Sequence, residues 1–222
     1  MEIIPAIIGK DFDEVEEKFD QVENLVRWVQ FDIMDGLFTE NESWPYFDFK
    51  EEPENLEYLD FVRTDTVKAE LHLMVKHPEK HLSKWIEAGV DRVLVHYEAT
   101  SEEVLNDIIE ELEQAEVQVG IALKLETSID VLDNFIDKLD VVQLMGIAEI
   151  GSYGIQFNEK VYDKIKGLRA RYPGATIEVD GGVSLENAKK LIEVGVDNLV
   201  IGSAIFKSEN IPETILKFRS II

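Results

Sequence analysis

The chain has 222 residues, 45% of them hydrophobic, and contains no cysteine. This content suffices for a single domain over residues 1–222, and the lack of cysteine excludes disulfides, thiolate metal sites and a cysteine nucleophile. With 46 acidic and 22 basic residues, the net charge of -24 disfavours binding to nucleic acid or anionic lipid. No signal peptide or membrane-spanning run is recognisable, so we expect a cytoplasmic protein that does not bind membranes.

Short runs rich in Val and Ile alternate with longer segments of helical period, which is typical of repeated βα units. The strands expected are residues 3–8, 26–34, 67–75, 92–96, 118–123, 141–147, 176–180 and 198–201. The helices expected are residues 12–25, 78–88, 102–115, 129–139, 158–172, 185–194 and 212–218. Eight such units predict an α/β fold, a single (β/α)8 TIM barrel.

Three predicted strands carry a group that can bind a proton or a metal near their ends. These are Asp32 on the second strand, His72 on the third and Asp180 on the seventh. In a closed parallel barrel these strand ends meet at one rim, where two carboxylates and an imidazole can surround a small substrate. Each residue alone also has a structural explanation, since a strand-end Asp can cap a helix and a strand His can pack in the core.

The longest irregular stretch, residues 37–53, follows the second strand. It contains Phe38, Trp44, Tyr46, Phe47 and Phe49. A loop of this length is often a lid or an oligomer contact, and an aromatic cluster packed beneath a loop is an equally good interpretation.

Small residues directly follow the last two strands. Gly181 and Gly182 come after the seventh strand, and Gly202 and Ser203 come after the eighth. Barrels commonly hold a phosphate at this place, where glycines let the backbone NH groups approach the ligand closely. The paired motifs therefore predict a phosphate-binding site.

In order and spacing, these motifs resemble the ribulose-phosphate 3-epimerase family. The resemblance extends to residues 4–8, 31–38, 71–75, 95–99 and 144–145. The resemblance implies that Asp32 and Asp180 exchange protons with the substrate. It also implies that Asp32, His72 and Asp180 bind a divalent metal ion such as Zn, Mn, Fe or Mg, and that Met34, Met74 and Met145 line the apolar side of the reacting carbon. A homo-oligomer acting on a small phosphorylated sugar is expected on the same ground.

The chemistry of epimerisation agrees with this resemblance. Inverting a carbon next to a ketone requires removal of a proton from one face and its return to the other, so two acid/base groups must flank the carbon. A cation can stabilise the enediolate formed in between. The first hypothesis is therefore an isomerase of the pentose phosphate pathway that interconverts D-ribulose 5-phosphate and D-xylulose 5-phosphate.

The sequence departs from the family pattern at three places. Gln30 stands where the family has a metal-binding histidine, and an amide is a poorer ligand than imidazole for zinc-like ions. Ala6 replaces a serine, and the loop at residues 146–157 is longer and brings Glu149 near the expected phosphate. Two alternatives therefore stay open: an epimerase for another sugar phosphate, or a non-catalytic barrel that binds a sugar phosphate or anion. Gln30, like the three methionines, is also a candidate substrate contact.

A related branch of phosphate-binding barrels, comprising decarboxylases and synthases, carries an Asp-x-Lys-x-x-Asp motif. Residues 32–35 of this chain read Asp-Ile-Met-Asp, with no lysine between the two acids. The sequence therefore disfavours that branch.

Overall fold

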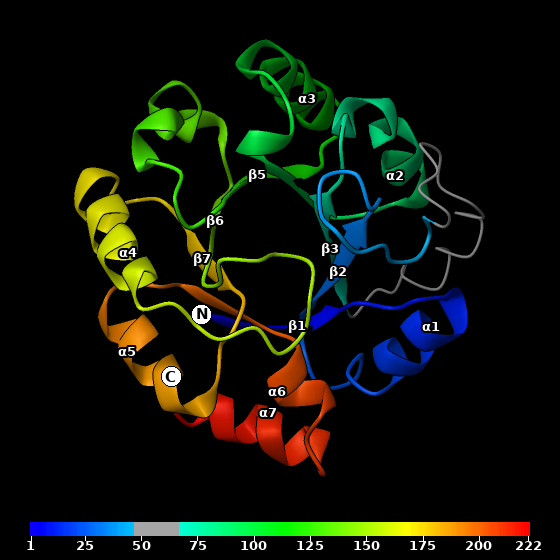
Figure 1. The fold of residues 1–222 in the computed structure, drawn as a ribbon, viewed down its shortest axis with the longest axis vertical. Helices are drawn as coiled ribbons and strands as arrows, with labels where there is room; N and C mark the ends of the chain where they lie inside the picture. The colour runs from blue at the N-terminus through cyan, green and yellow to red at the C-terminus, as the bar shows by residue number, and fades with distance from the viewer. Residues whose placement is uncertain (47–66) are drawn as a thin grey trace.

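The computed structural model describes residues 1–46 and 67–222. In this part of the chain, parallel strands close into a barrel in chain order, and the last strand pairs with the first (Figure 1). The strands are β1 (Glu2–Ile7), β2 (Trp28–Met34), β3 (Lys68–Met74), β4 (Arg92–His96), β5 (Gln118–Leu123), β6 (Val141–Met145), β7 (Ile177–Asp180) and β8 (Asn198–Ile201). The predicted (β/α)8 barrel is confirmed, and every strand boundary lies within two residues of its expected position.

Helices surround the barrel (Figure 1). They are α1 (Phe12–Asp20), α2 (Leu82–Ala88), α3 (Glu102–Gln114), α4 (Lys160–Arg171), α5 (Leu185–Glu193), α7 (Ile211–Arg219), the single-turn α6 (Ser203–Phe206) directly after β8, and the short 3-10 turns η2 (Pro78–Lys80) and η3 (Tyr97–Ala99). Side-chain caps fix several starts: Asp11 accepts a hydrogen bond from the Glu14 backbone NH at 3.0 Å, and Ser184 forms a capping box with Asn187.

The segment between β5 and β6 differs from the prediction. Two 3-10 turns, η4 (Ile129–Asn134) and η5 (Ile136–Lys138), replace the helix expected over residues 129–139. Leu132 and Phe135, both fully buried, are three residues apart, as is Ile129 from Leu132. A spacing of three fits the 3-10 helix, in which residues i and i+3 lie directly above one another.

Alternate residues of each strand face the helices and the barrel interior. On β2, Val29, Phe31 and Ile33 belong to the core between barrel and helices. Trp28, Gln30 and Asp32 therefore face the interior, and Trp28 packs there with residues of β1 and β8. Several interior positions of this barrel carry buried polar or charged side chains, and the site is built from some of them.

Toward the amino-terminal ends of the strands, the interior contains an ion cluster that we call the inner cluster. Arg92 Nη1 lies 2.5 Å from Glu70 Oε2 and 3.6 Å from Glu178 Oε2. Both glutamates are fully buried. The guanidinium carbon of Arg92 lies 4.0 Å from the ring centre of Trp28, a cation–π contact between two buried side chains at this end of the barrel.

The described part of the stretch after β2 is packed. Trp44 and Tyr46 are buried, and the Trp44 ring lies 5.7 Å from that of Phe12 and 6.3 Å from that of Trp85. Of the two interpretations of this stretch, the packed aromatic cluster holds for these two residues. Phe47 and Phe49 lie outside the described residues.

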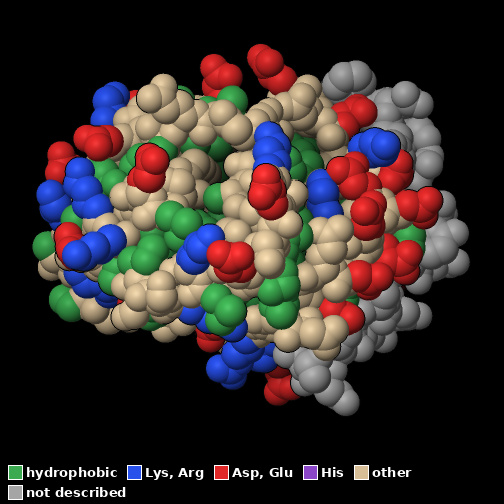
Figure 2. All heavy atoms as spheres, turned by 90° about the horizontal axis from the view of Figure 1, so that it is seen from below, with side chains coloured by type: hydrophobic (Ala, Val, Ile, Leu, Met, Phe, Trp, Pro, Cys, Tyr) green, Lys and Arg blue, Asp and Glu red, His purple; other side chains and the backbone are tan. Residues whose placement is uncertain are grey.

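The surface carries acidic and basic side chains dispersed among one another, and Figure 2 shows acidic groups densest toward one side of the face in view. Within the described ranges, no helix has both the length and the hydropathy needed to cross a bilayer.

Candidate active site

Three predicted residues converge at the carboxyl-terminal rim of the barrel. Asp32 and His72 are register partners on β2 and β3, and Asp180 ends β7. His72 Nδ1 lies 3.2 Å from Asp32 Oδ1 and 3.4 Å from Asp180 Oδ2. The possible ligand atoms of the three lie within 4.8 Å of one another, and no other such group of acids and histidines occurs among the described residues. With Gln30, we call them the rim cluster.

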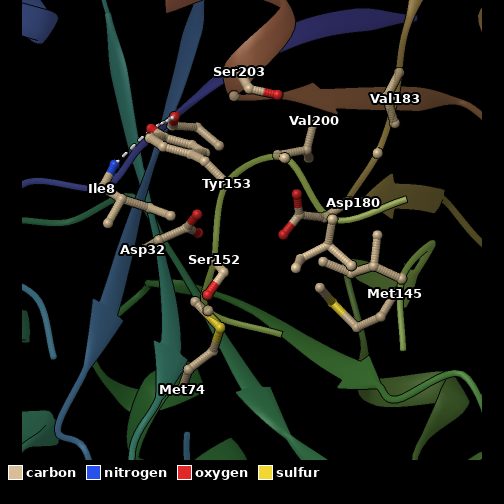
Figure 3. Close-up of a pocket in the computed structure, with 18 residues that line it drawn as sticks. Ile8, Asp32, Met74, Met145, Ser152, Tyr153, Asp180, Val183, Val200 and Ser203 are labelled. Carbon is tan, nitrogen blue, oxygen red and sulfur yellow. Dashed lines mark hydrogen bonds between the residues drawn. The ribbon is translucent and has the colours of Figure 1, made fainter. Parts of the chain in front are cut away.

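The two aspartates line one cavity of about 40 Å³. In Figure 3 their carboxylates point into the same space from opposite sides, which is where a reacting carbon would have to lie. Met74 and Met145 also line the cavity. Met34 does not, because its sulfur packs under Gly151, where an added Cβ would lie 2.6 Å from it.

The two glycine motifs lie on the same cavity. Gly181, Gly182, Gly202 and Ser203 all line it, next to the aspartates. Gly182 has a φ of 70°, and a Cβ there would lie 2.9 Å from the backbone of Phe157, so this position requires glycine. The predicted phosphate contacts and the predicted acid/base groups thus share one space.

Gln30 also faces the rim cluster. Its Nε2 donates to Asp32 Oδ1 at 2.6 Å and lies 3.4 Å from Asp180 Oδ2. Its Oε1 accepts from Gln143 Nε2 at 2.7 Å. The amide therefore stands beside the two carboxylates, where the family resemblance places an imidazole.

Burial and mutual charge shift the acidities of the rim cluster. Burial, together with the negative charge of Asp180, raises the pKa of Asp32 to about 6. Burial alone would lower the pKa of His72, but the hydrogen bonds and charges of Asp180 and Asp32 raise it to about 10. A carboxyl group with a pKa near neutrality can donate and accept protons at working pH, as proton transfer requires.

His96 and Glu98 form a hydrogen-bonded chain that orients His72. The sequence did not reveal this role. His72 Nε2 lies 2.9 Å from His96 Nε2, and His96 Nδ1 lies 3.1 Å from Glu98 Oε2. Glu98 also accepts from the Lys124 backbone NH at 2.8 Å and from the Thr127 hydroxyl. Burial lowers the pKa of His96 to about 4, so this ring is neutral. A neutral His96 that donates to Glu98 accepts from His72 Nε2, which directs His72 Nδ1 to the aspartates.

The loop between β6 and α4 crosses the barrel opening (Figure 1). Its Tyr153 hydroxyl donates to the Ala6 carbonyl at 2.8 Å and accepts from the Ile8 backbone NH at 3.0 Å, as Figure 3 shows. Tyr153 was missed in the sequence, where only its glycine neighbours signalled a turn. Small-molecule sites usually measure about 300–1,000 Å³, so this loop must move for a sugar phosphate to enter.

The expectation for Glu149 was wrong. This residue is exposed and lines a neighbouring hollow with Phe38 and Lys124, not the cavity of the aspartates. The loop folds Tyr153 inward after Gly151, whose φ of 83° permits the reversal, so Glu149 is left outside.

The rim cluster suits a divalent cation. Two carboxylates and an imidazole nitrogen face a common point, and a neutral histidine holds the remote nitrogen of the imidazole, as is usual for metal ligands. Gln30 presents its amino group to this point, and its oxygen would become a ligand only after the amide turned. Together, fold and site define a barrel protein with a carboxylate–imidazole centre at the carboxyl-terminal rim, the usual place of barrel active sites.

Comparisons with known proteins agree with this class. Residues 2–206 match the model described as "Ribulose-phosphate 3 epimerase family". The ribulose-phosphate 3-epimerase of Schizosaccharomyces pombe is 30% identical, with 99% of this chain and 93% of the relative covered. That of Bacillus subtilis is 31% identical, with 99% and 98% covered. The chain belongs to the ribulose-phosphate 3-epimerase family.

Two solved structures have a similar fold. A 3-keto-L-gulonate-6-phosphate decarboxylase from Vibrio cholerae aligns with a TM-score of 0.76 at 13% identity, covering 99% of this chain and 96% of that one. A 3-hexulose-6-phosphate synthase from Salmonella typhimurium aligns with a TM-score of 0.72 at 17% identity, covering 100% and 98%. At these identities the likeness concerns the fold alone.

Proposed function

We propose that the protein is a ribulose-phosphate 3-epimerase that interconverts D-ribulose 5-phosphate and D-xylulose 5-phosphate. The observation that carries the proposal is that Asp32 and Asp180 face one cavity from β2 and β7, on opposite sides of the space between them. Family membership and the names of the relatives support the same activity.

In the proposed reaction, one aspartate removes the proton from C3 of the ketose and the other delivers a proton to the opposite face. Because Asp32 and Asp180 reach the cavity from opposite sides, one acts as the base while the other acts as the acid. In the reverse direction the roles exchange. The positions of the two residues on separate strands fix which face of the carbon each one reaches.

His72 positions the acidic groups and completes the centre. When a divalent cation is bound by Asp32, His72 and Asp180, it supplies positive charge next to the substrate oxygens on which negative charge develops. Because Met74 and Met145 line the same cavity, they surround the reacting carbon with apolar side chains that have no proton to donate.

The phosphate is proposed to bind at the ends of β7 and β8, to the backbone NH groups around Gly181, Gly182 and Gly202 and to the Ser203 hydroxyl. This binding has to be local, because the net charge of -24 repels an anion at long range. Backbone NH groups can provide it without a basic side chain, and Glu149 lines a neighbouring hollow, not this cavity.

A coupled epimerase assay tests the proposal. Asp32→Asn and Asp180→Asn should each lower turnover by about 10²- to 10⁴-fold, the usual contribution of an acid/base group. Glu178→Gln is the matched control, because it removes an interior carboxylate from the same strand two residues away. If both aspartate variants keep turnover within a factor of ten, the two-aspartate mechanism is wrong.

Gln30, Ala6 and the long mouth loop are the grounds for two alternatives, which the family match and the named relatives do not support. An epimerase for another sugar phosphate would show higher kcat/KM on a different ketose phosphate in a substrate panel, still lost in Asp32→Asn. A non-catalytic barrel would bind sugar phosphates calorimetrically without turning them over.

The identity of the metal, a homo-oligomeric state and a cytoplasmic location stay predictions. Metal analysis of the purified protein, light scattering after size-exclusion chromatography and cell fractionation test them in turn. For the metal, the amide at position 30 favours Mn or Mg over Zn.

A further inference from the structure

Gln143 is a buried polar residue that the proposed mechanism does not use. It lies in the middle of β6, fully buried in the barrel interior. Its Nε2 donates to Gln30 Oε1 at 2.7 Å, while its own Oε1 has no hydrogen-bond partner among the described residues. A buried acceptor without a donor is costly and requires an explanation.

The unpartnered oxygen of Gln143 can be understood from the orientation of Gln30. The amino group of Gln30 points into the space bounded by the ligand atoms of the rim cluster, 2.6 Å from Asp32 Oδ1 and 3.4 Å from both Asp180 Oδ2 and His72 Nδ1. There its partial positive charge offsets the repulsion between the two carboxylates. An amide amino group cannot bind a cation, whereas an amide oxygen can. In this orientation Gln30 competes with a cation for the aspartates.

A half-turn of the terminal amide changes Gln30 from competitor to ligand. The terminal torsion of glutamine is broad and two-fold, and its oxygen and nitrogen occupy nearly the same volume, so the half-turn displaces no neighbour. It would place Gln30 Oε1 toward Asp32 and Gln30 Nε2 toward Gln143. The amino group of Gln143 would then face another amino group, so Gln143 must turn as well. Its unpartnered Oε1 is the acceptor that the turned Gln30 needs.

We propose that Gln30 and Gln143 form a coupled amide pair that turns when a divalent cation binds the rim cluster, with Gln143 as the positioning residue. In one orientation Gln30 donates to the aspartates and accepts from Gln143. In the other, Gln30 presents its oxygen to the cation and donates to Gln143. The inference rests on the metal site of the proposed function and explains how an amide can replace an imidazole ligand.

Side-chain amide NMR observes the turn directly. The chain contains six glutamines, so the 15N amide signals of a glutamine-labelled sample can be assigned by substitution. On titration with Mg²⁺ or Zn²⁺, both diamagnetic, the signals of Gln30 and Gln143 should shift together. Gln118 is the internal control, because its oxygen accepts from Arg92 Nε at 3.0 Å and its signal should stay in place. A shift of Gln30 with Gln143 unmoved would overturn the coupling.

Cation affinity, measured by calorimetry, gives an independent test. Once ionised, the side chain of Gln143→Glu only accepts hydrogen bonds, which fixes the Gln30 oxygen toward the cation. At a pH high enough to ionise it, Mn²⁺ binding should tighten by about ten-fold, the worth of one buried hydrogen bond. Gln143→Leu removes the acceptor and should weaken binding several-fold. Because the added carboxylate also attracts cations by its charge, both variants are repeated in the Gln30→His background.

The histidine background separates orientation from charge, as in a double-mutant cycle. A gain from Gln143→Glu that is equally large with Gln30→His would reflect charge alone and overturn the inference. If no cation binds but turnover still depends on Asp32, the amide pair is wrong and the epimerase proposal stands. If the amides turn on cation binding but Asp32→Asn is fully active, the pair stands and the proposed function fails.

Discussion

The barrel interior holds two clusters with similar kinds of charged groups and different character. Each combines two carboxylates with one basic side chain: Asp32, Asp180 and His72 at the rim, and Glu70, Glu178 and Arg92 in the inner cluster. The inner cluster is covered by Trp28 and its cation is permanent, since arginine does not give up its proton in proteins. The rim cluster opens on a cavity, and histidine can release its proton to a base or exchange it for a metal ion.

The comparison shows that composition alone does not make a buried ionic group a functional site. Access and a replaceable cation distinguish the rim cluster, whereas the inner cluster is neutralised internally and is covered by Trp28. The following experiments probe this distinction, from the largest expected effect to the smallest.

Removing the arginine of the inner cluster should lower the stability of the fold and leave turnover unchanged. Arg92→Met leaves Glu70 and Glu178 buried without their partner, and should lower the free energy of unfolding by about 3–5 kcal/mol. Urea denaturation at pH 7 measures the effect. Lys160→Met, which breaks an exposed ion pair with Glu126, is the control and should cost less than about 1 kcal/mol. A loss of similar size in both variants would mean that the inner cluster is not a desolvated ion group.

The pH dependence of stability should report on Glu178. Burial and the nearby charge of Glu70 hold the pKa of Glu178 well above its ordinary value of 4.5. The folded state therefore retains a proton that the unfolded state loses. Stability should fall as the pH rises from 4.5 toward the raised pKa, by about 1.4 kcal/mol for each pH unit in that interval.

Glu178→Gln should make that fall shallower, and the part that remains comes from Asp32, His72 and Glu70, whose pKa values are raised as well. The variant should match the parent protein near pH 4, where the glutamate is protonated in both states, and exceed it in stability at pH 8. Thermal unfolding followed across this pH range gives the comparison. Turnover should change little, and a parallel pH profile for parent and variant would show that Glu178 ionises normally.

The smallest effect concerns access to the rim cluster. Tyr153→Phe removes the hydroxyl that bridges Ala6 and Ile8, which weakens closure of the mouth loop by about 1 kcal/mol. Because the cavity beneath the fastened loop is too small for a sugar phosphate, weaker closure favours the open loop, and KM should fall about five-fold for a change of this size, with kcat nearly constant. Tyr162→Phe, which alters an aromatic residue on α4 outside the cavity, is the control. An unchanged KM would remove the loop from substrate binding.

The features that the sequence predicted follow from local rules. Asp32 and Asp180 could be placed at one rim because a parallel barrel brings all strand ends together, whatever their distance along the chain. The strands could be predicted from their runs of β-branched residues. The close backbone approach at Gly182 could be predicted because a glycine directly follows β7. Family resemblance added the pairing of these residues with a sugar phosphate.

What escaped prediction depends on contacts between distant segments. The partnership of Gln30 with Gln143 joins residues 113 positions apart, and neither has a pattern around it that indicates the other. Tyr153 and Glu149 lie on one loop, and their opposite orientations depend on a reversal at Gly151 that composition does not reveal. The 3-10 turns before β6 show the same limit, since an apolar spacing of three also occurs on α-helices.

Trp28 and Arg92 are buried and fill the amino-terminal end of the barrel interior, which has a kinetic consequence. With that end closed, the sugar that arrives and the sugar that departs must use the same opening, beneath the loop that Tyr153 fastens. The product must therefore leave the cavity before the next substrate molecule can bind. The rate at which the loop opens then sets an upper limit on the turnover rate, however fast the proton transfers are.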